Sequence, residues 1–393
     1  MLQRPSIGGQ RDEYPHAKRA SDVWEPGITR RTSMIVFVTT AEHDYTLRTF
    51  LDHQRSPLDG GVILMSYSEL LSWRHVPKGT YILADLDRLD TVTRARVAER
   101  WGVIQEVSPG LRCLNDPRRF LDRWQLAEAL HRQGRSPQKA RRLDGDLSDL
   151  RYPAFIRHQD GHEGPLSEPL DGEAELWDRA RAIMDSGGAR LDQLWAVEYV
   201  DVRDEGGLFL KYSSFRIGER IFAHDLSMSR NWVCKGEDDA EDGADQIRTD
   251  RAFQVGNPHR ELLRPVFDTA GVEYGRIDYA IHHGELVVFE INSNPYISPV
   301  DIGNPIWDDS MQHIVQQYTL GMAALGLERE SPYYLDLGTN DAEERIVAST
   351  RLRGLIRRTL KATRTLHYEP HVSRMRALLR GATHRNHATT SLR

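Results

Sequence analysis

Cysteine and long apolar runs are both scarce in this sequence. Only two cysteines, Cys113 and Cys234, occur in 393 residues, which excludes a disulfide framework, and neither has the spacing of a metal ligand. The strongest apolar run, Met34 to Val38, has the length of one strand and is far too short to span a membrane. Residues 1–33 are polar and lack the apolar core of a secretory leader. These absences predict a protein without a membrane span, in the reducing cytoplasm.

An excess of positive charge is missing as well. The formal net charge is −6, from 52 Lys and Arg against 58 Asp and Glu, a balance that does not indicate nucleic-acid binding. The length suits two or three domains. We expect a disordered arm at 1–33, a small α/β domain at 34–120, a larger α+β domain at 121–330 and a basic, partly helical tail at 331–393. From Arg351 onward the tail is strongly basic, which would allow attraction to an acidic partner, to RNA or to an anionic membrane surface; the alternative is a solvated helical tail without a partner.

Short apolar runs and helical patterns alternate in the first part of the chain. Met34–Thr40, Gly61–Met65 and Tyr81–Ala84 have the length and composition of buried strands. Tyr45–Gln54 and Asp90–Trp101 have helical patterns, the second with Asp90 as its N-cap. This alternation predicts a parallel α/β layer.

Three further segments carry weaker patterns. The acidic stretch Gly236–Gln246 is typical of a solvated loop, with a lid over substrate as the alternative. A short helix that follows should bury Leu262 and Leu263, and Pro265 should end or kink it. Ile314–Leu325 is expected to be a helix that closes the larger domain.

The most informative segment is an expected β-hairpin between Tyr274 and Pro295, with its turn at Gly284. Side chains alternate between the two faces of a strand, so Arg276 and Asp278 share one face of the first strand. Glu290, Asn292 and Asn294 likewise share one face of the second strand. With a three-residue loop, Asp278 lies opposite Glu290 and Arg276 lies opposite Asn292.

This pairing predicts a site for a divalent cation. Two carboxylates and an amide at cross-strand distance offer only oxygen ligands, which Mg²⁺ prefers, and Arg276 beside them suits an anion. The alternative is a solvated surface pair of little energetic value. Asp278 and Glu290 would repel each other without a cation between them, however, and we favour the metal site.

The same residues resemble a known signature. An R-x-D strand, a turn and then E-x-N-x-N-P resemble the carboxy-terminal motif of the ATP-grasp superfamily, whose members include D-alanine–D-alanine ligase, glutathione synthetase and a ribosomal-protein glutamate ligase. The resemblance implies two α+β subdomains that clasp a nucleotide, preceded by a small parallel α/β domain. It implies that Asp278, Glu290 and Asn292 hold Mg²⁺ or Mn²⁺ on ATP, and that Arg276 contacts phosphate or the reaction intermediate.

The resemblance extends to a strand and loop upstream of the hairpin. The strand Tyr152–Arg157 matches one that usually ends in a phosphate-binding lysine, and Gly161 and Gly164 follow where the family has a flexible loop over the phosphates. Arg157 stands in place of the lysine. Arginine keeps the charge but changes the geometry of phosphate binding, which puts activity in doubt.

The remaining carried-over positions surround the expected nucleotide. Leu194–Val200 resembles the strand that holds adenine through its backbone, with Glu198 as its acid and Tyr199 and Val200 as backbone contacts. Arg216, before a turn at Gly218, matches an arginine that reaches the triphosphate or the acyl substrate, and Arg230 matches a second one. Each of these residues alone could instead be an ordinary core or surface residue.

The resemblance implies a carboxylate–amine ligase. ATP would convert a carboxylate into an acylphosphate, and an amine would displace phosphate, with Arg276 and Arg216 as catalytic residues and ATP and Mg²⁺ as cofactors. The carboxylate could belong to a small molecule or a peptide, and the protein could form a homo-oligomer. The alternatives are a kinase on the same fold, a nucleotide-binding protein without ligase activity, and an adaptor that works through the basic tail.

Overall fold

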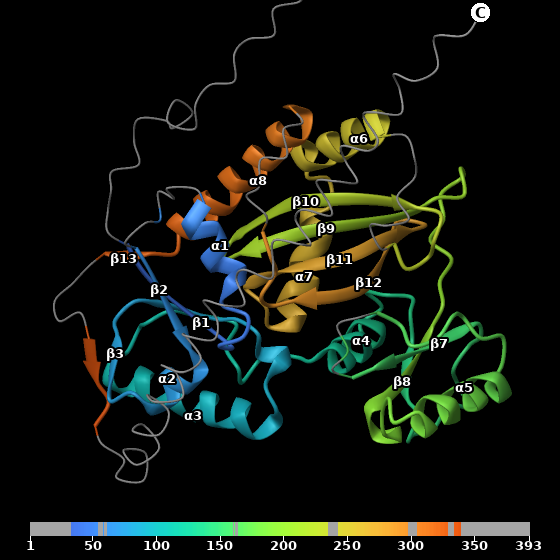
Figure 1. Ribbon diagram of the computed structural model, residues 1–393, viewed down its shortest axis with the longest axis horizontal. Helices are drawn as coiled ribbons and strands as arrows, with labels where there is room; N and C mark the ends of the chain where they lie inside the picture. Colours follow the sequence, from blue (N-terminus) through green and yellow to red (C-terminus); the bar gives the residue numbers. More distant parts are fainter. Residues whose placement is uncertain are drawn as a thin grey trace, which may run out of the picture. The chain divides into compact units, whose positions relative to one another are not determined.

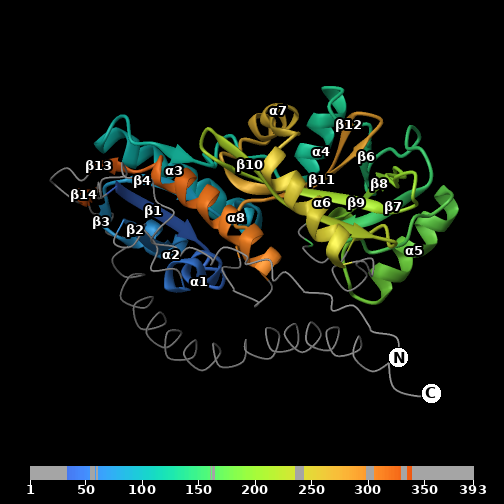
Figure 2. The ribbon, with the colours of Figure 1, turned by 90° about the horizontal axis from the view of Figure 1, so that it is seen from above.

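The computed structural model describes residues 33–53, 58, 61–159, 161, 164–234, 243–297, 305–328 and 334–338 (Figures 1 and 2). The arm expected at 1–33 therefore lies outside the described residues except for Ser33, and so does the tail beyond Gly338. None of the helices in these ranges has the length and apolar character needed to cross a membrane.

The first part of the chain forms a parallel sheet, as expected from its alternating pattern. The strands run in the order β2-β1-β4-β5 and all neighbours are parallel: β2 (Val62–Ser66), β1 (Ser33–Thr39), β4 (Thr80–Leu83) and β5 (Cys113–Leu114). The helices of this part are α1 (Tyr45–His53), α2 (Tyr67–Ser72) and α3 (Thr91–Val107). Asp90 caps α3 by accepting a hydrogen bond from the Thr93 N–H, which confirms the expected N-cap.

A small antiparallel sheet follows, in the order β6-β8-β7. Its strands are β6 (Ala140–Arg142), β8 (Leu194–Glu198) and β7 (Ala154–His158), and α5 (Glu173–Asp185) packs against it through Leu176, Ala180 and Ile183. The 3-10 turn η3 (Leu191–Gln193) leads into β8. Helix α4 (Arg123–Arg132) precedes β6 and contacts both β6 and β12.

The larger antiparallel sheet carries the expected hairpin. Its order is β10-β9-β11-β12, with β10 (Arg220–Ser229), β9 (Phe209–Ile217), β11 (Tyr274–His282) and β12 (Glu285–Asn292) side by side in Figure 1. Three helices accompany it: α6 (Gly243–Gly256), α7 (Arg260–Ala270) and α8 (Pro305–Ala323). Figure 2 shows α6 running beside α8 and β10. The protein is thus a mixed α/β fold with one parallel and two main antiparallel sheets.

The two faces of the larger sheet bury different helices. On one face, here called the α7 face, Ile221 and Ile277 pack with Phe267 of α7. On the opposite face, here called the site face, Phe215 packs with Tyr318 of α8. Because cross-strand partners share a face, the register assigns the paired residues 212–217 of β9 and 274–279 of β11 to one of these two faces.

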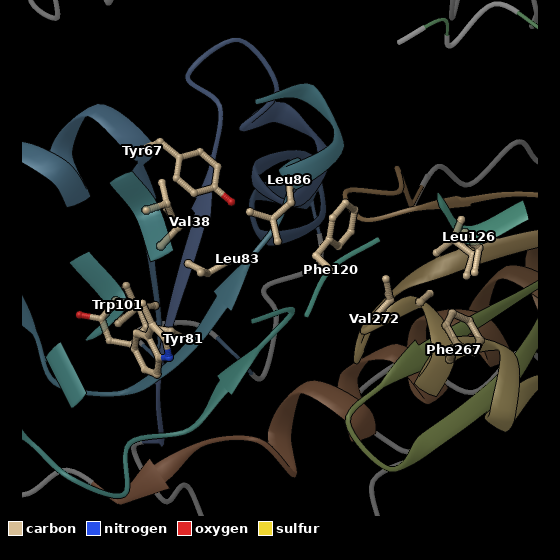
Figure 3. Packing of buried hydrophobic residues seen from close by; sticks show 14 of the residues in the cluster. Val38, Tyr67, Tyr81, Leu83, Leu86, Trp101, Phe120, Leu126, Phe267 and Val272 are labelled. Atoms are coloured by element: carbon tan, nitrogen blue, oxygen red, sulfur yellow. The ribbon is translucent and has the colours of Figure 1, made fainter. Parts of the chain in front are cut away.

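One apolar cluster continues from the parallel sheet into the larger antiparallel sheet. Val38, Tyr81 and Trp101 belong to the same cluster as Val272 and Phe267, as Figure 3 shows. A buried polar contact reinforces the connection. Asn115, which follows β5, donates to the carbonyls of Leu83 and Tyr274 and accepts from the N–H groups of Glu273 and Tyr274.

After α8 the chain returns to the parallel part. β13 (Leu327–Glu328) pairs antiparallel with the start of β1, and β14 (Tyr334–Asp336) pairs with β3 (His75–Pro77). Arg74 holds this end through hydrogen bonds of 2.8 and 2.9 Å to the Asp336 carboxylate. β14 lies within the range 331–393 that the sequence analysis assigns to a partly helical tail.

Two local expectations were wrong in part. Pro265 does not end α7, which runs on to Ala270. Leu263 is buried as expected, but the side chain of Leu262 is exposed. The residues after Pro265 pack into the core, and this burial outweighs the missing N–H. The expected acidic loop also ends early, because α6 begins at Gly243; residues 235–242 lie outside the described ranges.

Candidate functional site

The hairpin brings its polar residues together in the expected register. Asp278 pairs with Glu290, and Arg276 pairs with Asn292. The loop is shorter than expected, however, because His282 pairs with Glu285 and only His283 (φ 50) and Gly284 (φ 83) form the turn. Two positive φ values in a two-residue turn are typical of type I′. A bulge between Asp278 and Tyr279 of β11 on the pairing ladder, with Phe289 as the extra residue of β12, then restores the register.

Arg276 and Asp278 form a hydrogen-bonded pair on the site face. Arg276 Nε lies 2.9 Å from one oxygen of Asp278 and Nη2 lies 3.2 Å from the other. Burial acts to lower the pKa of Arg276, but the charge and hydrogen bonds of Asp278 raise it above its ordinary value. The pair is therefore a fixed guanidinium next to a carboxylate, both at the same end of β11.

Glu290 is the shared partner of two buried arginines. Its Oε2 lies 3.1 Å from Arg123 Nη2 and 3.6 Å from Arg157 Nη2. Arg157 also donates to the Phe289 carbonyl at 2.9 Å and lies over the ring of Trp195. Burial lowers the pKa of Arg157, and the charge of Glu290 opposes this shift. The expected phosphate-binding arginine therefore does reach the hairpin, from the separate sheet β6-β8-β7.

Arg123 is a member of this cluster that the sequence analysis missed. It is the first residue of α4, after the N-cap Asp122, and its side chain is 7% exposed. It also donates to the carbonyl of Gly161, within the loop expected to cover phosphates. No local motif marks Arg123, because its contact with Glu290 exists only once α4 packs against β12.

The proposed metal ligands are all engaged by protein donors. Asn292 Oδ1 accepts the N–H of Asn294 at 2.8 Å, while Asp278 and Glu290 face arginines. Across the described ranges, no group of three or more His, Cys, Asp and Glu side chains converges in a way that could hold a metal ion. A site here would thus consist of two carboxylates and one amide, which is the number that Mg²⁺ takes from protein when phosphates and water supply the rest.

More polar side chains continue across the site face. Ser213 pairs with both Asp278 and Asp225 on its neighbouring strands, and its hydroxyl lies 2.9 Å from His224 Nδ1. Burial and then the charge of Arg276 lower the pKa of His224 to about 3, so this imidazole is neutral at pH 7. Burial raises the pKa of Asp225. Lys211, on the same face of β9, donates to the Cys234 carbonyl at 2.7 Å.

Arg216 does not belong to the cluster. It pairs with Gly275 on β11, so its side chain lies on the α7 face, opposite to Arg276 and Asp278. There it donates to Asp268 at 2.6 Å, to the Gly218 carbonyl at 3.0 Å and to the Val272 carbonyl at 3.2 Å. Its assignment as a catalytic or phosphate-binding residue is therefore corrected: the contacts of Arg216 hold α7 to the sheet.

Arg230 follows the last residue of β10 and its side chain is exposed. Its role as a second phosphate-binding arginine stays a prediction. For Arg216, by contrast, the order of the arginines in the sequence was a poor guide to position, because Arg216 lies on the α7 face.

The strand that was expected to hold adenine is present as β8, but Glu198 at its end contacts Arg151. Glu198 accepts from Arg151 Nη2 at 2.7 Å, from the Arg151 N–H at 2.9 Å and from the Lys139 N–H at 3.3 Å. Burial alone would raise the pKa of Glu198, but these hydrogen bonds bring it below its ordinary value. Tyr199 and Val200 pack with Trp232 beside the site face. Glu198 is thus a support for the strand, and Tyr199 and Val200 follow it directly after β8.

A largely apolar pocket adjoins the arginine cluster. Arg123, Arg157 and Glu290 form its polar end, and Leu126, Phe155 and Trp195 are among the apolar residues that line the rest. Trp124 contacts Trp195 edge to face, with ring centroids 6.0 Å apart. Tryptophan residues therefore lie close enough to report on changes at Arg157.

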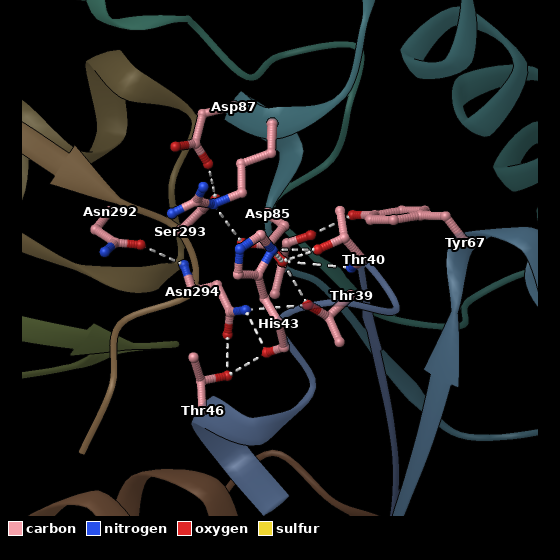
Figure 4. Close-up of polar contacts among 12 residues, drawn as sticks. Thr39, Thr40, His43, Thr46, Tyr67, Asp85, Asp87, Asn292, Ser293 and Asn294 are labelled. Carbon is pink, nitrogen blue, oxygen red and sulfur yellow. Dashed lines mark hydrogen bonds and ion pairs between the residues drawn. The ribbon is translucent and has the colours of Figure 1, made fainter. Parts of the chain in front are cut away.

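A second polar cluster lies next to the hairpin, at the carboxyl ends of β1 and β4 (Figure 4). Thr39, Thr40, His43 and Asp85 belong to it and reach the hairpin through Asn294. We call these five residues the strand-end cluster. No motif of the sequence marks this cluster. Ligands often bind where parallel strands end, however, and that rule alone singles out Thr40 and Asp85.

Comparisons with known proteins give likeness to solved structures alone. No family model matches the sequence, and no curated protein matches it. D-alanine–D-alanine ligase from Bacillus anthracis is similar at 10% identity and a TM-score of 0.42, covering 74% of this chain and 99% of that chain.

Two further solved structures show similarity at the same level. L-amino acid ligase from Bacillus licheniformis has 12% identity and a TM-score of 0.41, with coverage of 77% of each chain. A RimK domain ATP-grasp protein from Sphaerobacter thermophilus has 13% identity and a TM-score of 0.38, covering 72% of this chain and 98% of that chain. Similarity this low leaves the site to be judged from its own geometry.

Proposed function

We propose that this protein is an ATP- and Mg²⁺-dependent ligase of the ATP-grasp kind, which activates a carboxylate as an acylphosphate and joins it to an amine. The observation that carries the proposal is the register of the β11–β12 hairpin. It sets Asp278 opposite Glu290 and Arg276 opposite Asn292. Arg157, from a different sheet, reaches the same carboxylate of Glu290.

The charges of the cluster suit a metal–nucleotide complex. Arg123, Arg157 and Arg276 face two carboxylates, Asp278 and Glu290, so the arginines are in excess by one. Phosphate oxygens bind guanidinium groups in the same bidentate way as carboxylates, so a polyphosphate can compete for these arginines. That exchange would free the oxygens of Asp278 and Glu290 for a cation.

The oxygen ligands fit Mg²⁺ in kind and number. Asp278, Glu290 and Asn292 are the residues that would hold the ion, because hard cations prefer carboxylate and amide oxygens. When bound, Mg²⁺ would withdraw charge from the phosphates and so assist phosphoryl transfer. Carboxylate and amide oxygens also suit Mn²⁺.

In the mechanism that we infer, the protein aligns reactants and stabilises charge. The γ-phosphoryl of ATP moves to a carboxylate oxygen, and an amine then forms the new C–N bond as the C–O bond to phosphate breaks. Arg276, held by Asp278 in a fixed orientation, would donate to the developing negative charge on the acyl group. Arg123 and Arg157 would hold the phosphates in line, and Tyr199, Val200 and Trp232 would contact the base.

Calorimetric titration with ATP, with and without Mg²⁺, tests the nucleotide site. We expect metal-dependent binding to the wild type and at least tenfold weaker binding to Asp278→Asn and Glu290→Gln, a difference of about 1.4 kcal/mol. Glu285→Gln is the matched control, because Glu285 is exposed near the turn of the same hairpin. Absence of binding by a wild type with a folded circular-dichroism spectrum would reject the proposal.

The products distinguish a ligase from its alternatives. A ligase releases ADP and free phosphate only when a carboxylate and an amine are both present. A kinase on the same fold would release ADP and leave a stable phosphorylated product. Coupled assays for ADP and for phosphate, run on the same samples, separate the two reactions.

A nucleotide-binding protein without ligase activity is the second candidate. Arg157 contacts the Phe289 carbonyl, Glu290 and the ring of Trp195, so groups of the protein itself already engage its guanidinium. The variant Arg157→Lys would then separate the role of this residue in nucleotide binding from its role in turnover. If phosphate contact limits catalysis, the lysine variant should bind Mg²⁺–ATP within about tenfold of the wild type and turn over at a different rate. Tight binding without turnover by both forms would support the second candidate.

A further inference from the structure

The strand-end cluster contains the buried carboxylate of Asp85 and the partly exposed side chain of His43 beside it. Asp85 follows β4 with φ 60 and ψ 22, a left-handed conformation that non-glycine residues seldom adopt. Its side chain is 2% exposed. One oxygen, Oδ2, accepts from Thr39 Oγ1 at 2.7 Å, from Thr40 Oγ1 at 2.7 Å and from the Thr40 N–H at 3.3 Å. Strained backbone that fixes a buried polar group is typical of functional sites.

Thr40 connects this carboxylate to His43. Its hydroxyl lies 2.7 Å from Asp85 Oδ2 and also 2.7 Å from His43 Nδ1, while Nδ1 is 3.6 Å from the carboxylate itself. A hydroxyl has a single hydrogen, and the carboxylate of Asp85 can only accept, so Thr40 donates to Asp85. In a neutral ring, Nδ1 then donates to Thr40 and Nε2 is the acceptor.

His43 lies beside the loop that follows the hairpin. Figure 4 shows its ring among Thr40, Asp85 and the Ser293–Asn294 segment. The side chain is 28% exposed. Asn294 Nδ2 donates to the His43 carbonyl at 3.1 Å, and the Asn294 N–H donates to Asn292 Oδ1 at 2.8 Å. His43 is thus tied through one residue to the amide proposed to face the metal.

Aromatic rings continue from His43 along the same edge. Tyr45 lies 6.1 Å from His43, and Tyr296 lies 6.2 Å from Tyr45, measured between ring centroids. Arg88, whose Nε is 3.4 Å from Asp85 Oδ1, borders the cluster on its other side. A substrate at this edge would therefore meet a proton acceptor, two aromatic rings and a cation.

We propose that His43 is the general base of the second half-reaction and that the strand-end cluster is where the amine substrate binds. His43 Nε2 takes a proton from the amine nitrogen as that nitrogen bonds to the acyl carbon of the acylphosphate. The C–O bond to phosphate breaks, phosphate leaves with the electron pair, and the imidazolium is stabilised by Asp85 through Thr40. This proposal rests on the ligase function proposed above.

The role of His43 in turnover can be tested with two nucleophiles, of which only one needs a general base to attack the acylphosphate. Hydroxylamine is largely unprotonated at neutral pH and is a strong nucleophile, so it captures acylphosphates without help. With Mg²⁺–ATP and a mixture of the twenty amino acids as carboxylates and amines, we compare hydroxamate formation with amide formation. His43→Gln should lower the ratio of amide to hydroxamate at least fiftyfold. An unchanged ratio would overturn the proposal.

A matched variant controls for the loss of a histidine beside a carboxylate. His75 Nε2 lies 3.7 Å from Asp336 Oδ2, and His75→Gln should leave the ratio of the two products unchanged. Calorimetry with Mg²⁺–ATP, applied to His43→Gln, separates the two proposals. A wild type that binds no nucleotide rejects the ligase function, whereas normal binding with an unaltered product ratio rejects only the role of His43.

The tautomer can be tested without any turnover. Long-range proton–nitrogen NMR on the full chain with ¹⁵N-labelled histidine distinguishes a protonated from an unprotonated ring nitrogen, and the His43→Gln spectrum assigns the signal. We expect Nδ1 to carry the hydrogen, and Thr40→Val, which keeps the side-chain shape, to weaken that preference. A hydrogen on Nε2 of the neutral wild-type ring would overturn the proposal whatever the substrates are.

Discussion

Two arginines on adjacent strands show that the face of the sheet on which a residue lies determines its contacts. Arg276 and Arg216 lie next to each other across the sheet, because Arg216 pairs with Gly275 and Arg276 pairs with Phe215. Arg276 faces Asp278 on the site face, whereas Arg216 faces Asp268 on the α7 face. The same type of side chain therefore belongs to the polar cluster of the site face in one position and holds a helix to the sheet in the other.

Replacement of Arg216 should affect stability and leave nucleotide binding unchanged. Its side chain is 5% exposed and donates to two carbonyls and to Asp268. Arg216→Met leaves the Gly218 and Val272 carbonyls without this donor, and we expect the free energy of unfolding to fall by about 1–3 kcal/mol. Urea titration measures this change, and calorimetry should give the wild-type affinity for Mg²⁺–ATP. Loss of affinity in a folded variant would return Arg216 to the site.

The sequence could place only some of the site residues. Alternation along a strand fixed Arg276 with Asp278 and Glu290 with Asn292, because a period of two depends on nothing beyond the strand itself. The contact of Arg123 with Glu290 depends on the packing of α4 against β12, which no local pattern encodes.

At the scale of elements, the β11–β12 hairpin contains two glycines with different constraints. Gly284 is in the turn at φ 83, and a Cβ there meets nothing within 4 Å. Gly275 lies beside the site, and a Cβ there would be 2.8 Å from the Asn292 carbonyl oxygen and 2.9 Å from Val272 Cγ1. Gly284 is needed because the turn requires a positive φ, whereas Gly275 is needed because a side chain there would keep the two strands apart.

These constraints predict different results for the two alanine variants. Gly284→Ala should lower the free energy of unfolding by about 1 kcal/mol through backbone strain and keep the affinity for Mg²⁺–ATP. Gly275→Ala should lower both, because separation of β11 from β12 displaces Asn292 from Arg276. Urea titration and calorimetry on both variants provide the comparison. Equal effects of the two substitutions on affinity would contradict this account.

The packing of α6 on β10 contains a second carboxylate pair. Asp250 of α6 is 2% exposed and accepts from the Leu226 N–H and from Gln254, both at 2.8 Å. Burial, and then the charge of Asp225, raise the pKa of Asp250 to about 8. A folded-state pKa above that of the unfolded chain means that stability is fully present below about pH 4 and is lost as the pH rises through about 8.

The unfolding free energy should therefore fall between pH 5 and pH 8. The slope from Asp250 is at most about 1.4 kcal/mol per pH unit, and Asp250→Asn should remove it. Urea titrations of both proteins at several pH values give the difference curve, in which contributions from all other groups cancel. Parallel curves for the two proteins would show that the pKa of Asp250 is ordinary.

Elements with local signals were easier to predict than their boundaries. The N-cap at Asp90 and the turn at Gly218 follow from side-chain and backbone preferences that act within a few residues. The continuation of α7 past Pro265 could not be predicted this way, because burial of Val266 and Phe267 against the sheet outweighs the proline.

At the scale of the whole molecule, buried asparagines connect the parallel sheet to the hairpin. Asn115 joins the end of β5 to the start of β11, and Asn294 joins the end of β12 to Thr39 and Thr46. Both side chains are at most 5% exposed. The parallel sheet therefore takes part in positioning the loop after Asn292.

Replacement of Asn294 should destabilise the end of β1 and the end of β12 together. Asn294→Ala loses hydrogen bonds to Thr39, Thr46 and the His43 carbonyl, and we expect a loss of about 2 kcal/mol in unfolding free energy. Hydrogen exchange should increase at the end of β1 and at the end of β12 in the same variant. Asn231→Ala, at an exposed turn, is the control. Faster exchange in only one of the two strands would show that they are not coupled through Asn294.

The bulge in β12 has a consequence for changes in chain length. Eleven residues, 279–289, separate Asp278 from Glu290, and an odd interval cannot close around a two-residue turn unless one residue stays unpaired. Whether the number of residues between Asp278 and Glu290 is odd or even thus decides whether the hairpin needs a bulge. Deletion of Phe289 makes the interval even and keeps Asp278 opposite Glu290, whereas deletion of Ile291 turns Asn292 to the opposite face. Of these two single deletions in β12, the one that removes the unpaired residue is the one that keeps Asp278, Glu290 and Asn292 on a shared face.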